Sequence, residues 1–337
     1  MPVFNSGIVP ASGAVATELQ AVTRRAFIPK LVVQLYNATP MLSLLLRTAQ
    51  RARGGLSQIT IPVQGNSLVT SSWAGYDGTF PQPAIVTGIQ NAEFNLKLLL
   101  TPVPFLATEA LIQSTEAVIP LAKARLADIK TQMTQTISTA LFTENTGTPL
   151  VTDSLTMAYD DSTNTNVYGG INRTTNTFWK STLKTSAGGI STRTSMIPFL
   201  VQTTSLAGGE APDFAVMNPG DWATLMTDYM SSESFRTMPG TKYGKDDMIN
   251  AGFRGVLLGD TPFFMDPFCP QGTCIIMNSK YLALYLSEDA PFAFSGFHSA
   301  IPNLQLAEIG VVIVLFDVVC AKPISGMRIT GITGNKF

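Results

Sequence analysis

His298 is the only histidine of the 337-residue chain, so a catalytic site built on an imidazole must use it. It lies in "FSGFHSAIP", and no nucleophile motif surrounds it. A Ser-His-Asp or Cys-His site needs a nucleophile within hydrogen-bonding reach of its base. We therefore interpret His298 as a structural or surface residue, and the sequence predicts no catalytic residue and no enzyme.

The three cysteines, Cys269, Cys274 and Cys320, lack the spacing of a metal site. Four residues separate Cys269 from Cys274, and no second pair of ligands exists elsewhere in the chain. A structural zinc site draws on four cysteine or histidine ligands, usually as closely spaced pairs. We expect three free thiols in a reducing compartment, and no bound metal.

Glycine-rich and acidic stretches also fail to form a known site. "GGLSQ", "YGGINR" and "AGGEAP" match neither the dinucleotide fingerprint nor the phosphate-binding loop, and no GxSxG is present. The acid pairs Asp160-Asp161 and Asp246-Asp247 lie in polar stretches typical of solvated loops. The sequence predicts no cofactor.

Composition points to contacts between protein surfaces. Charged residues make up 13% of the chain and hydrophobic residues 45%, whereas about a quarter of an average globular protein is charged. A dispersed monomer needs a charged surface, so this deficit indicates that much of the surface faces other protein. The net charge of −1 argues against a dedicated nucleic-acid-binding protein.

Positive charge is concentrated near the N-terminus. Residues 1–53 hold one acid, Glu18, and six cations: Arg24, Arg25, Lys30, Arg47, Arg51 and Arg53. This asymmetry predicts an arm that meets acidic protein or a packaged polyanion. Scattered, solvated charges are the alternative. We expect no secretory signal at "MPVFNSGIVP", and the apolar run Val311–Phe316 is too short for a membrane span.

The elements expected along the chain begin with a broken helix over 14–50, interrupted at Pro29 and Pro40. Residues 54–104 carry three charges and read as a long hairpin whose turn-rich tip holds Trp73, Tyr76 and Phe80. Because this hairpin is too polar for a core and too uncharged for a free surface, we expect it to lie on another surface.

A long helix is predicted from Leu121 to Thr143. Its apolar positions recur at three- and four-residue steps and form one stripe: Ala122, Leu126, Ile129, Met133, Ile137 and Ala140. Residues 144–190 read as loops with short strands. The rest alternates helices with short strands, including "DFAVMN", "TPFFMD", "CIIMN", "YLALYL" and "IGVVIVLFDVVCA".

The stretch "VYGGINRTTNTFWKS" (167–181) is interpreted as a contact loop. Gly169 and Gly170 permit a tight turn, and Phe178 with Trp179 would anchor the loop. The anchor could lie against the same subunit or against a neighbour.

Three further stretches carry a family resemblance: "PDFAVMNPGDWATL" (212–225), "GFRGVLLGDTPFFMDPFCPQGTCIIMNSKYLALY" (252–285) and "IPNLQLAEIGVVIVLFDVVCAKPISGMRITGI" (301–332). With the order of elements, they resemble the major capsid proteins of tailed bacteriophages, which have the HK97-like fold. The 167–181 stretch is similar to one that follows the long helix in a branch of these proteins. The likeness spans nearly the whole chain and rests on order and loose patterns. The expected fold class is therefore α+β.

The resemblance implies a shell subunit with four parts. They would be an N-terminal arm (1–53), an extended β-hairpin loop (54–100), a peripheral domain with a spine helix (101–185 and 301–337) and an axial α/β domain (186–300). By analogy, the hairpin reaches over a neighbouring subunit, and the axial domains meet around five-fold and quasi-six-fold axes. The candidate intersubunit contacts are Trp73, Tyr76, Phe80, Phe178 and Trp179.

The partners that the resemblance implies are other copies of the chain, as pentamers and hexamers in an icosahedral shell, and packaged double-stranded DNA, touched non-specifically. We expect a separate scaffolding protein and a portal, with room for a decoration protein, and no membrane. The shell would assemble in the cytoplasm of a bacterial host and become the virion capsid. Covalent cross-linking through Lys97 and Asn335 is not expected, because neither lies in a matching motif.

Two other functions stay open. An encapsulin-like compartment would use the same fold around enzyme cargo. A hydrolase or sugar-binding protein would use the loops of residues 144–190, although the chain is poor in histidine and clustered acids.

Trp73→Ala is predicted to impair assembly more than folding, because large amphipathic rings dominate interface energy. Shell yield and subunit unfolding, measured side by side, test this. Equal loss of both would place Trp73 in the core of its own subunit.

Overall fold

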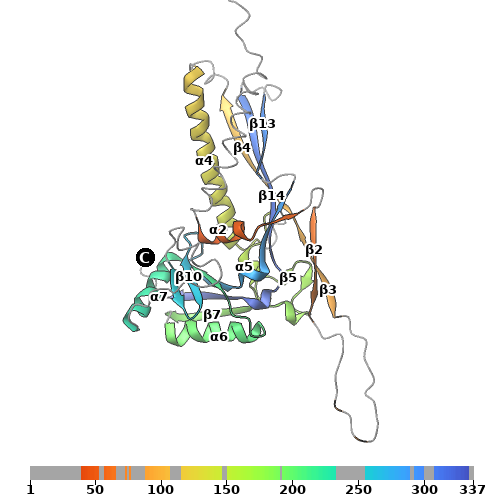
Figure 1. Cartoon of the computed structure of the whole chain (residues 1–337), viewed down its shortest axis with the longest axis vertical. Coiled ribbons are helices and arrows are strands. Elements are labelled where there is room, and N and C mark those ends of the chain that lie inside the picture. The colour runs from red at the N-terminus through yellow and green to blue at the C-terminus, as the bar shows by residue number, and fades with distance from the viewer. Residues whose placement is uncertain are drawn as a thin grey trace, which may run out of the picture.

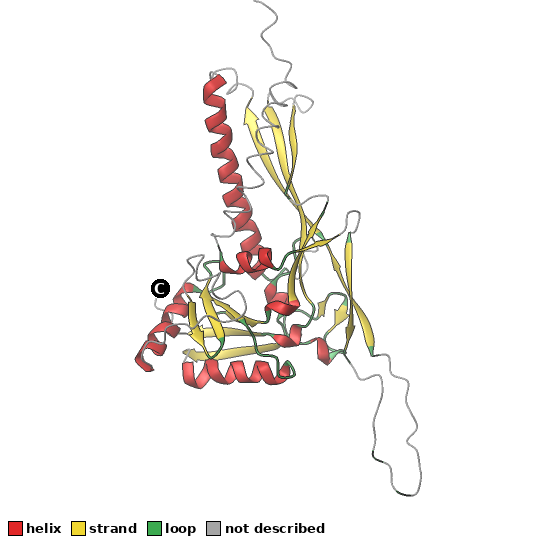
Figure 2. Ribbon diagram, in the orientation of Figure 1, coloured by secondary structure: helices red, strands yellow, loops and turns green. Residues whose placement is uncertain are grey.

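The computed structural model describes residues 39–52, 57–65, 73, 76, 88–106, 115–145, 150–189, 192–232, 255–288, 292–299 and 307–333. Within these ranges the chain forms two larger β-sheets, a long helix and a projecting two-stranded hairpin (Figures 1 and 2). The mixture of sheets and segregated helices agrees with the expected α+β class. No helix in this described part is long and apolar enough to cross a membrane.

The long sheet is built on β14 (Ala307–Cys320). One edge of β14 pairs antiparallel with β4 (Lys97–Leu106) over ten positions. Its other edge pairs with β12 (Leu282–Ser287) and then β13 (Ala293–Ser299), while β1 (Gln50–Ala52) adds in parallel to β12. The strand β13, which contains His298, was not predicted, because "AFSGFHS" lacks a regular apolar alternation.

The compact sheet has the strand order β7 (Thr182–Gly189), β15 (Met327–Thr333), β11 (Cys274–Met277), β8 (Phe214–Met217), β10 (Thr261–Met265) and β9 (Gly255–Leu258). Figure 1 shows α6 (Ile197–Leu206) beneath β7 and α7 (Pro219–Ser232) beside β10. Asn218 caps α7 by accepting a hydrogen bond from the Gly220 N–H. The Trp222 Nε1–H donates to the Phe263 carbonyl at 3.1 Å and ties α7 to the sheet.

The sheets cross the expected domain boundaries. β12 and β13 fall in the segment 186–300 but pair with β14. β15 falls in the segment 301–337 but pairs with β7 and β11. Which strands pair depends on contacts between distant parts of the chain, and local patterns do not report those contacts. The strand pairing therefore runs across the expected division at residue 301, and the expected domain bounds stay a prediction.

The long helix α4 runs from Thr115 to Phe142, starting six residues before the expected Leu121. Pro120 removes one backbone hydrogen bond near its N-terminal end, which a 28-residue helix tolerates. The stripe is confirmed where side chains are described: Ile129, Met133 and Ile137 are buried. At the C-terminal end of the stripe Leu141 is buried, whereas the expected Ala140 is only half-buried.

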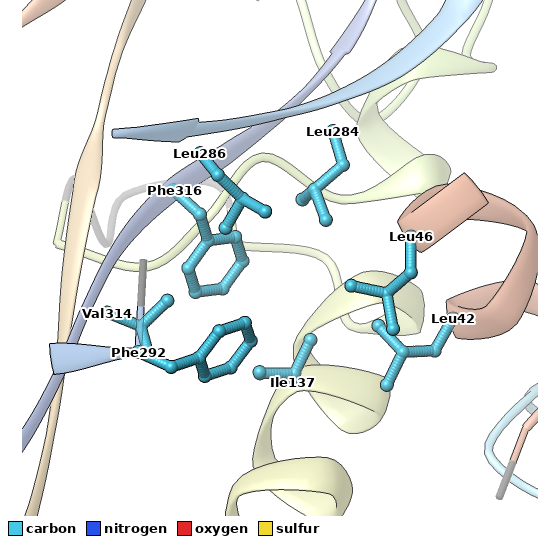
Figure 3. Close-up of a pocket in the computed structure, with 8 residues that line it drawn as sticks. All are labelled: Leu42, Leu46, Ile137, Leu284, Leu286, Phe292, Val314 and Phe316. Atoms are coloured by element: carbon cyan, nitrogen blue, oxygen red, sulfur yellow. The ribbon is translucent and has the colours of Figure 1, made fainter. Parts of the chain in front are cut away.

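Residues 40–47, within the expected N-terminal arm (1–53), pack on the core of the subunit. The helix α2 (Pro40–Arg47) buries Met41, Leu42 and Leu45. The Met41 N–H donates to the Asp266 carboxylate at 3.4 Å. Leu42 and Leu46 of α2, together with Ile137 and residues of β12 and β14, line a cavity of about 10 Å³ (Figure 3). Such a space holds one water at most and is apolar, so it is a packing gap and no ligand site.

Leu45→Ala should lower the free energy of unfolding by about 3 kcal/mol, because Leu45 is fully buried and its loss leaves a cavity. Denaturant unfolding of the subunit measures this. Gln50→Ala, at an exposed position of β1, is the control and should stay within about 0.5 kcal/mol. Equal losses of unfolding free energy in the two variants would contradict the placement of α2 in the core.

Candidate assembly surface and hairpin anchor

The residues first considered for chemistry do not converge. His298 lies exposed on β13, opposite Ile309 of β14. Cys269, Cys274 and Cys320 are buried and unpaired, and burial raises the pKa of the Cys320 thiol to about 11. No group of three His, Cys, Asp or Glu side chains in the described ranges could hold a metal ion.

The long sheet instead carries an open apolar face. Every second residue of β4 and β14 points to the same side of the sheet, and cross-strand pairs there join Leu98 to Leu315, Leu100 to Ile313 and Pro102 to Val311. Leu98 is 53% exposed and Leu100 is 52% exposed. We call the six residues of these pairs the open face.

The opposite side of the same strands is core. Val103, Val312, Val314 and Phe316 are buried. A strand that is apolar at successive positions is typical of burial on both faces. The side chains of the run Val311–Phe316 on one face of the sheet are therefore packed against the core. Those on the other face stay partly exposed to solvent. An apolar patch of this kind on a soluble protein marks an interaction site.

The outer edge of β4 is poor in hydrogen-bond donors. In an antiparallel ladder alternate residues direct their N–H and C=O groups away from the paired strand. Pro102 and Pro104 lie two residues apart in β4, and proline has no N–H. The strand therefore lacks two backbone donors.

The hairpin strands β2 (Gln58–Gln64) and β3 (Ile89–Asn95) pair over seven positions. Their side chains alternate between two faces: Ile59 lies opposite Phe94 on the side that packs on the core, while Thr60 and Glu93 face the other way. The strand β3 ends before Leu96, whose N–H donates to the Ser57 carbonyl. Beyond Leu96 the chain leaves the hairpin and enters the long sheet as β4.

The hairpin tip is described only at Trp73 and Tyr76, and both side chains are fully exposed. Phe80 lies outside the described residues. Two exposed aromatic rings in a segment poor in charge fit the predicted role as contact residues, which stays a prediction.

The stretch 167–181 anchors the hairpin base. Tyr168, at the end of β5 (Val167–Tyr168), lies edge-on to Phe94 of β3, with ring centroids 5.1 Å apart. The Glu93 N–H donates to the Gly169 carbonyl at 2.9 Å, and Gln90 Nε2 donates to Asn176 Oδ1 at 2.9 Å. These contacts join β3 to the body of the same subunit.

Glycines allow this close approach. Gly169 has φ +55°, and a Cβ there would overlap the Phe94 ring. A Cβ at Gly65, where β2 ends, would overlap the ring of Phe178. Phe178 is therefore an intrasubunit contact of the hairpin base.

Trp179 is a core residue. It is 1% exposed, stacks on Tyr168 and donates from Nε1 to the Tyr168 carbonyl at 2.9 Å. A side chain with so little surface cannot contact a neighbour. The intersubunit assignment is thus wrong for Trp179, and the short 3-10 turn Thr177–Trp179 turns it inward.

Arg173, which the sequence did not single out, holds the anchor together. It is fully buried and donates to the carbonyls of Met157 (2.6 Å), Ala158 (2.7 Å), Trp179 (3.2 Å) and Thr165 (3.3 Å). Its guanidinium lies 5.0 Å from the Tyr168 ring centroid. Burial lowers the pKa of Arg173. Two of these carbonyls end the short helix α5 (Leu155–Ala158), where a cation is favoured.

A charged cluster links the two sheets. Glu210 follows α6 and accepts hydrogen bonds from Lys280 Nζ at 2.8 Å and Lys322 Nζ at 2.9 Å. These bonds hold the pKa of Glu210 at about 2. Lys322 follows β14 and Lys280 precedes β12, so the cluster joins the end of the long sheet to the loop beside the compact sheet.

The expected arm cations are described only in part. Arg47 lies exposed at the end of α2, and Arg51 lies exposed on β1. Arg24, Arg25, Lys30 and Arg53 lie outside the described residues. Contact of this group with DNA or acidic protein stays a prediction.

No protein-family model matches the sequence, and no curated protein is similar to it in sequence. Solved structures are similar along most of the chain. A capsid protein of cyanophage A-1(L) aligns with a TM-score of 0.69 and 16% identity, covering 88% of this chain and 93% of that one. The chain has the HK97-like capsid fold.

Two further structures share the HK97-like fold. The SrpI encapsulin of Synechococcus elongatus aligns with a TM-score of 0.56 and 10% identity, covering 87% of this chain and 89% of that one. The capsid of a native GTA particle aligns with a TM-score of 0.53 and 10% identity, covering 86% and 91%. The resemblance stated from sequence is confirmed at the level of the fold.

The open face of this HK97-like subunit was missed in the sequence. Its signal was present in the apolar run Val311–Phe316, which was considered only as a strand segment too short for a membrane span. The alternating exposure of β4 depends on its register with β14, which no local pattern shows.

Arg173→Lys should lower the free energy of unfolding by about 3 kcal/mol, because one ammonium cannot reach four carbonyls and leaves buried acceptors unpaired. Thermal and denaturant unfolding measure it. Arg51→Lys, at an exposed site, is the matched control and should change little. If Arg173→Lys left the free energy of unfolding unchanged, the guanidinium would not be the group that holds the anchor.

Proposed function

We propose that the chain is a major capsid protein that self-assembles into an icosahedral shell around phage double-stranded DNA. The observation that carries this proposal is the open face, an apolar layer on β4 and β14 that one subunit leaves uncovered. The HK97-like fold supports it, because the cyanophage and GTA structures with this fold are capsids. The role is structural and involves no catalysis.

Assembly would cover the open face with a neighbouring copy. Full burial of a Leu or Ile side chain contributes about 1.5–3 kcal/mol. Because Leu98 and Leu100 are about half exposed in one subunit, part of this contribution would be realised only on assembly. The occupant in this proposal is the hairpin of the next subunit, whose exposed Trp73 and Tyr76 are apolar and uncharged. Such a contact joins two different surfaces, so it propagates and closes into rings when the rotation fits.

The remaining partners follow from this role. Pentamers and hexamers would build the shell, with scaffolding and portal proteins supplied separately and a decoration protein accommodated outside. The N-terminal cations would touch packaged DNA without sequence preference. The shell would assemble in the bacterial cytoplasm and end as the virion capsid. The N-terminal arm, the extended hairpin loop, the peripheral domain and the axial domain are proposed under the same names. Each strand of the two larger sheets is assigned to the sheet in which it pairs.

An encapsulin-like compartment is the second candidate, because the SrpI encapsulin shares the fold. Electron microscopy of the protein expressed with its neighbouring genes tests both candidates. Closed shells that contain DNA support the capsid. Closed shells that contain an enzyme support the compartment, and small discrete species of folded protein contradict both. Turnover of a glycoside or ester, lost on substitution of His298, would support a hydrolase instead.

Leu100→Glu should abolish shells while leaving the subunit folded, because it places a charge in the open face at a position already 52% exposed. Microscopy gives the shell yield, and thermal unfolding gives the stability. Gln271→Glu adds the same charge at an exposed turn before β11 and should assemble normally. Normal shells from Leu100→Glu would exclude the open face as an interface.

A further inference from the structure

Asp317 lies where the open face ends. Along β14 it has the same orientation as Val311, Ile313 and Leu315, two residues beyond the last of them. Unlike those residues it is fully buried. The cover is the segment 150–154, which leads into α5, and α5 itself packs on β14.

The cover is held by one oxygen of Asp317. Its Oδ1 accepts hydrogen bonds from the Thr152 hydroxyl at 2.9 Å, the Asp153 N–H at 3.0 Å and the Val318 N–H at 3.0 Å. Its Oδ2 is buried and has no hydrogen-bond partner. A buried carboxylate with one unsatisfied oxygen is costly to keep charged. The same carboxyl therefore fastens the segment and disfavours its own negative charge.

The surroundings of Asp317 contain both signs of charge. The titratable groups that face it are Asp153 of the covering segment, Lys97 at the start of β4, Tyr285 opposite on β12 and Tyr168 on β5. Burial, and then the Asp153 carboxylate, raise the pKa of Asp317 to about 7. Burial also raises the pKa of Asp153, and Lys97 opposes that rise. Two carboxyls thus compete for one proton beside a single lysine.

We propose that Asp317 and Asp153 form a pH-operated latch that clamps the segment 150–154 over one end of the open face. While the pair holds a proton, the segment stays bonded to β14. When the proton leaves, two negative charges face each other and the segment opens. Opening uncovers Asp317, and the segment then no longer bounds this end of the open face.

The direction of the pH effect follows from linkage. The pKa of Asp317 is higher in the closed state, about 7, than its ordinary value of 3.8. Closing therefore takes up a proton between these values. The free energy that favours the closed segment is greatest at the acid end and falls as the pH rises towards 7. Above pH 7 it does not fall further.

Hydrogen exchange of the amides of residues 150–158, in the full chain at pH 5, 6, 7 and 8 and corrected for intrinsic rates, tests the latch. We expect the opening equilibrium to rise at least tenfold from pH 5 to pH 8. Asp317→Asn keeps an acceptor oxygen and should remove the pH dependence. Asp161→Asn, in the next loop, should retain it. A flat wild-type profile, or an unchanged slope in Asp317→Asn, overturns the latch.

Asp153→Asn is the second variant and decides the case if Asp317→Asn does not fold. Removing the competing charge should shift the transition to lower pH, and an unmoved transition contradicts the latch. The consequence for assembly rests on the proposed function and needs its own measurement. Shell yield should differ between pH 6 and pH 8 in the wild type. If no shells form at any pH, the proposed function fails, while the exchange profile still decides the latch.

Discussion

The apolar run of β14 is the constraint on which the other elements depend. Residues 311–316 are apolar at each position, and a strand sends successive side chains to opposite faces. One subunit supplies one covering layer, made by α2 and α4. The ten-position ladder with β4 extends the uncovered side across a second strand. The fold thus covers one side of the run within the subunit, and the proposed assembly would cover the other side.

The hairpin depends on a different balance. Its strands form a two-stranded ribbon, which is only marginally stable alone in water. The Tyr168 ring, the Gly169 carbonyl and Asn176 join β3 to the body, and Arg173 holds the segment that carries them. The aromatic residues of 167–181 therefore act within the subunit, so that the hairpin leaves the body from a fixed base. Contact between the hairpin tip and a neighbour stays a prediction.

The sequence allowed the elements to be predicted better than their partners. The long helix and the hairpin strands have periodic apolar positions, and the central strands of the compact sheet are short continuous apolar runs. Both kinds of pattern are local properties of the sequence. Pairing is not local: β15 joins β7 across more than a hundred residues, and α2 enters the core through Asp266, far along the chain. Trp179 was placed at an interface because its type suits one, whereas its burial depends on the turn at residues 177–179. Arg173 and Asp317 were missed because nothing in a single sequence separates a buried charge from a solvated one.

The donor-poor edge of β4 has a consequence for a protein made in many copies. An apolar strand with an exposed edge is a template for adding further strands and growing fibres. Pro102 and Pro104 take two N–H groups from that template, so β4 offers fewer donors to a second chain. In the proposed assembly, subunits would then meet through side-chain surfaces, which can separate and rebind, in preference to a backbone-bonded filament that would be a kinetic trap.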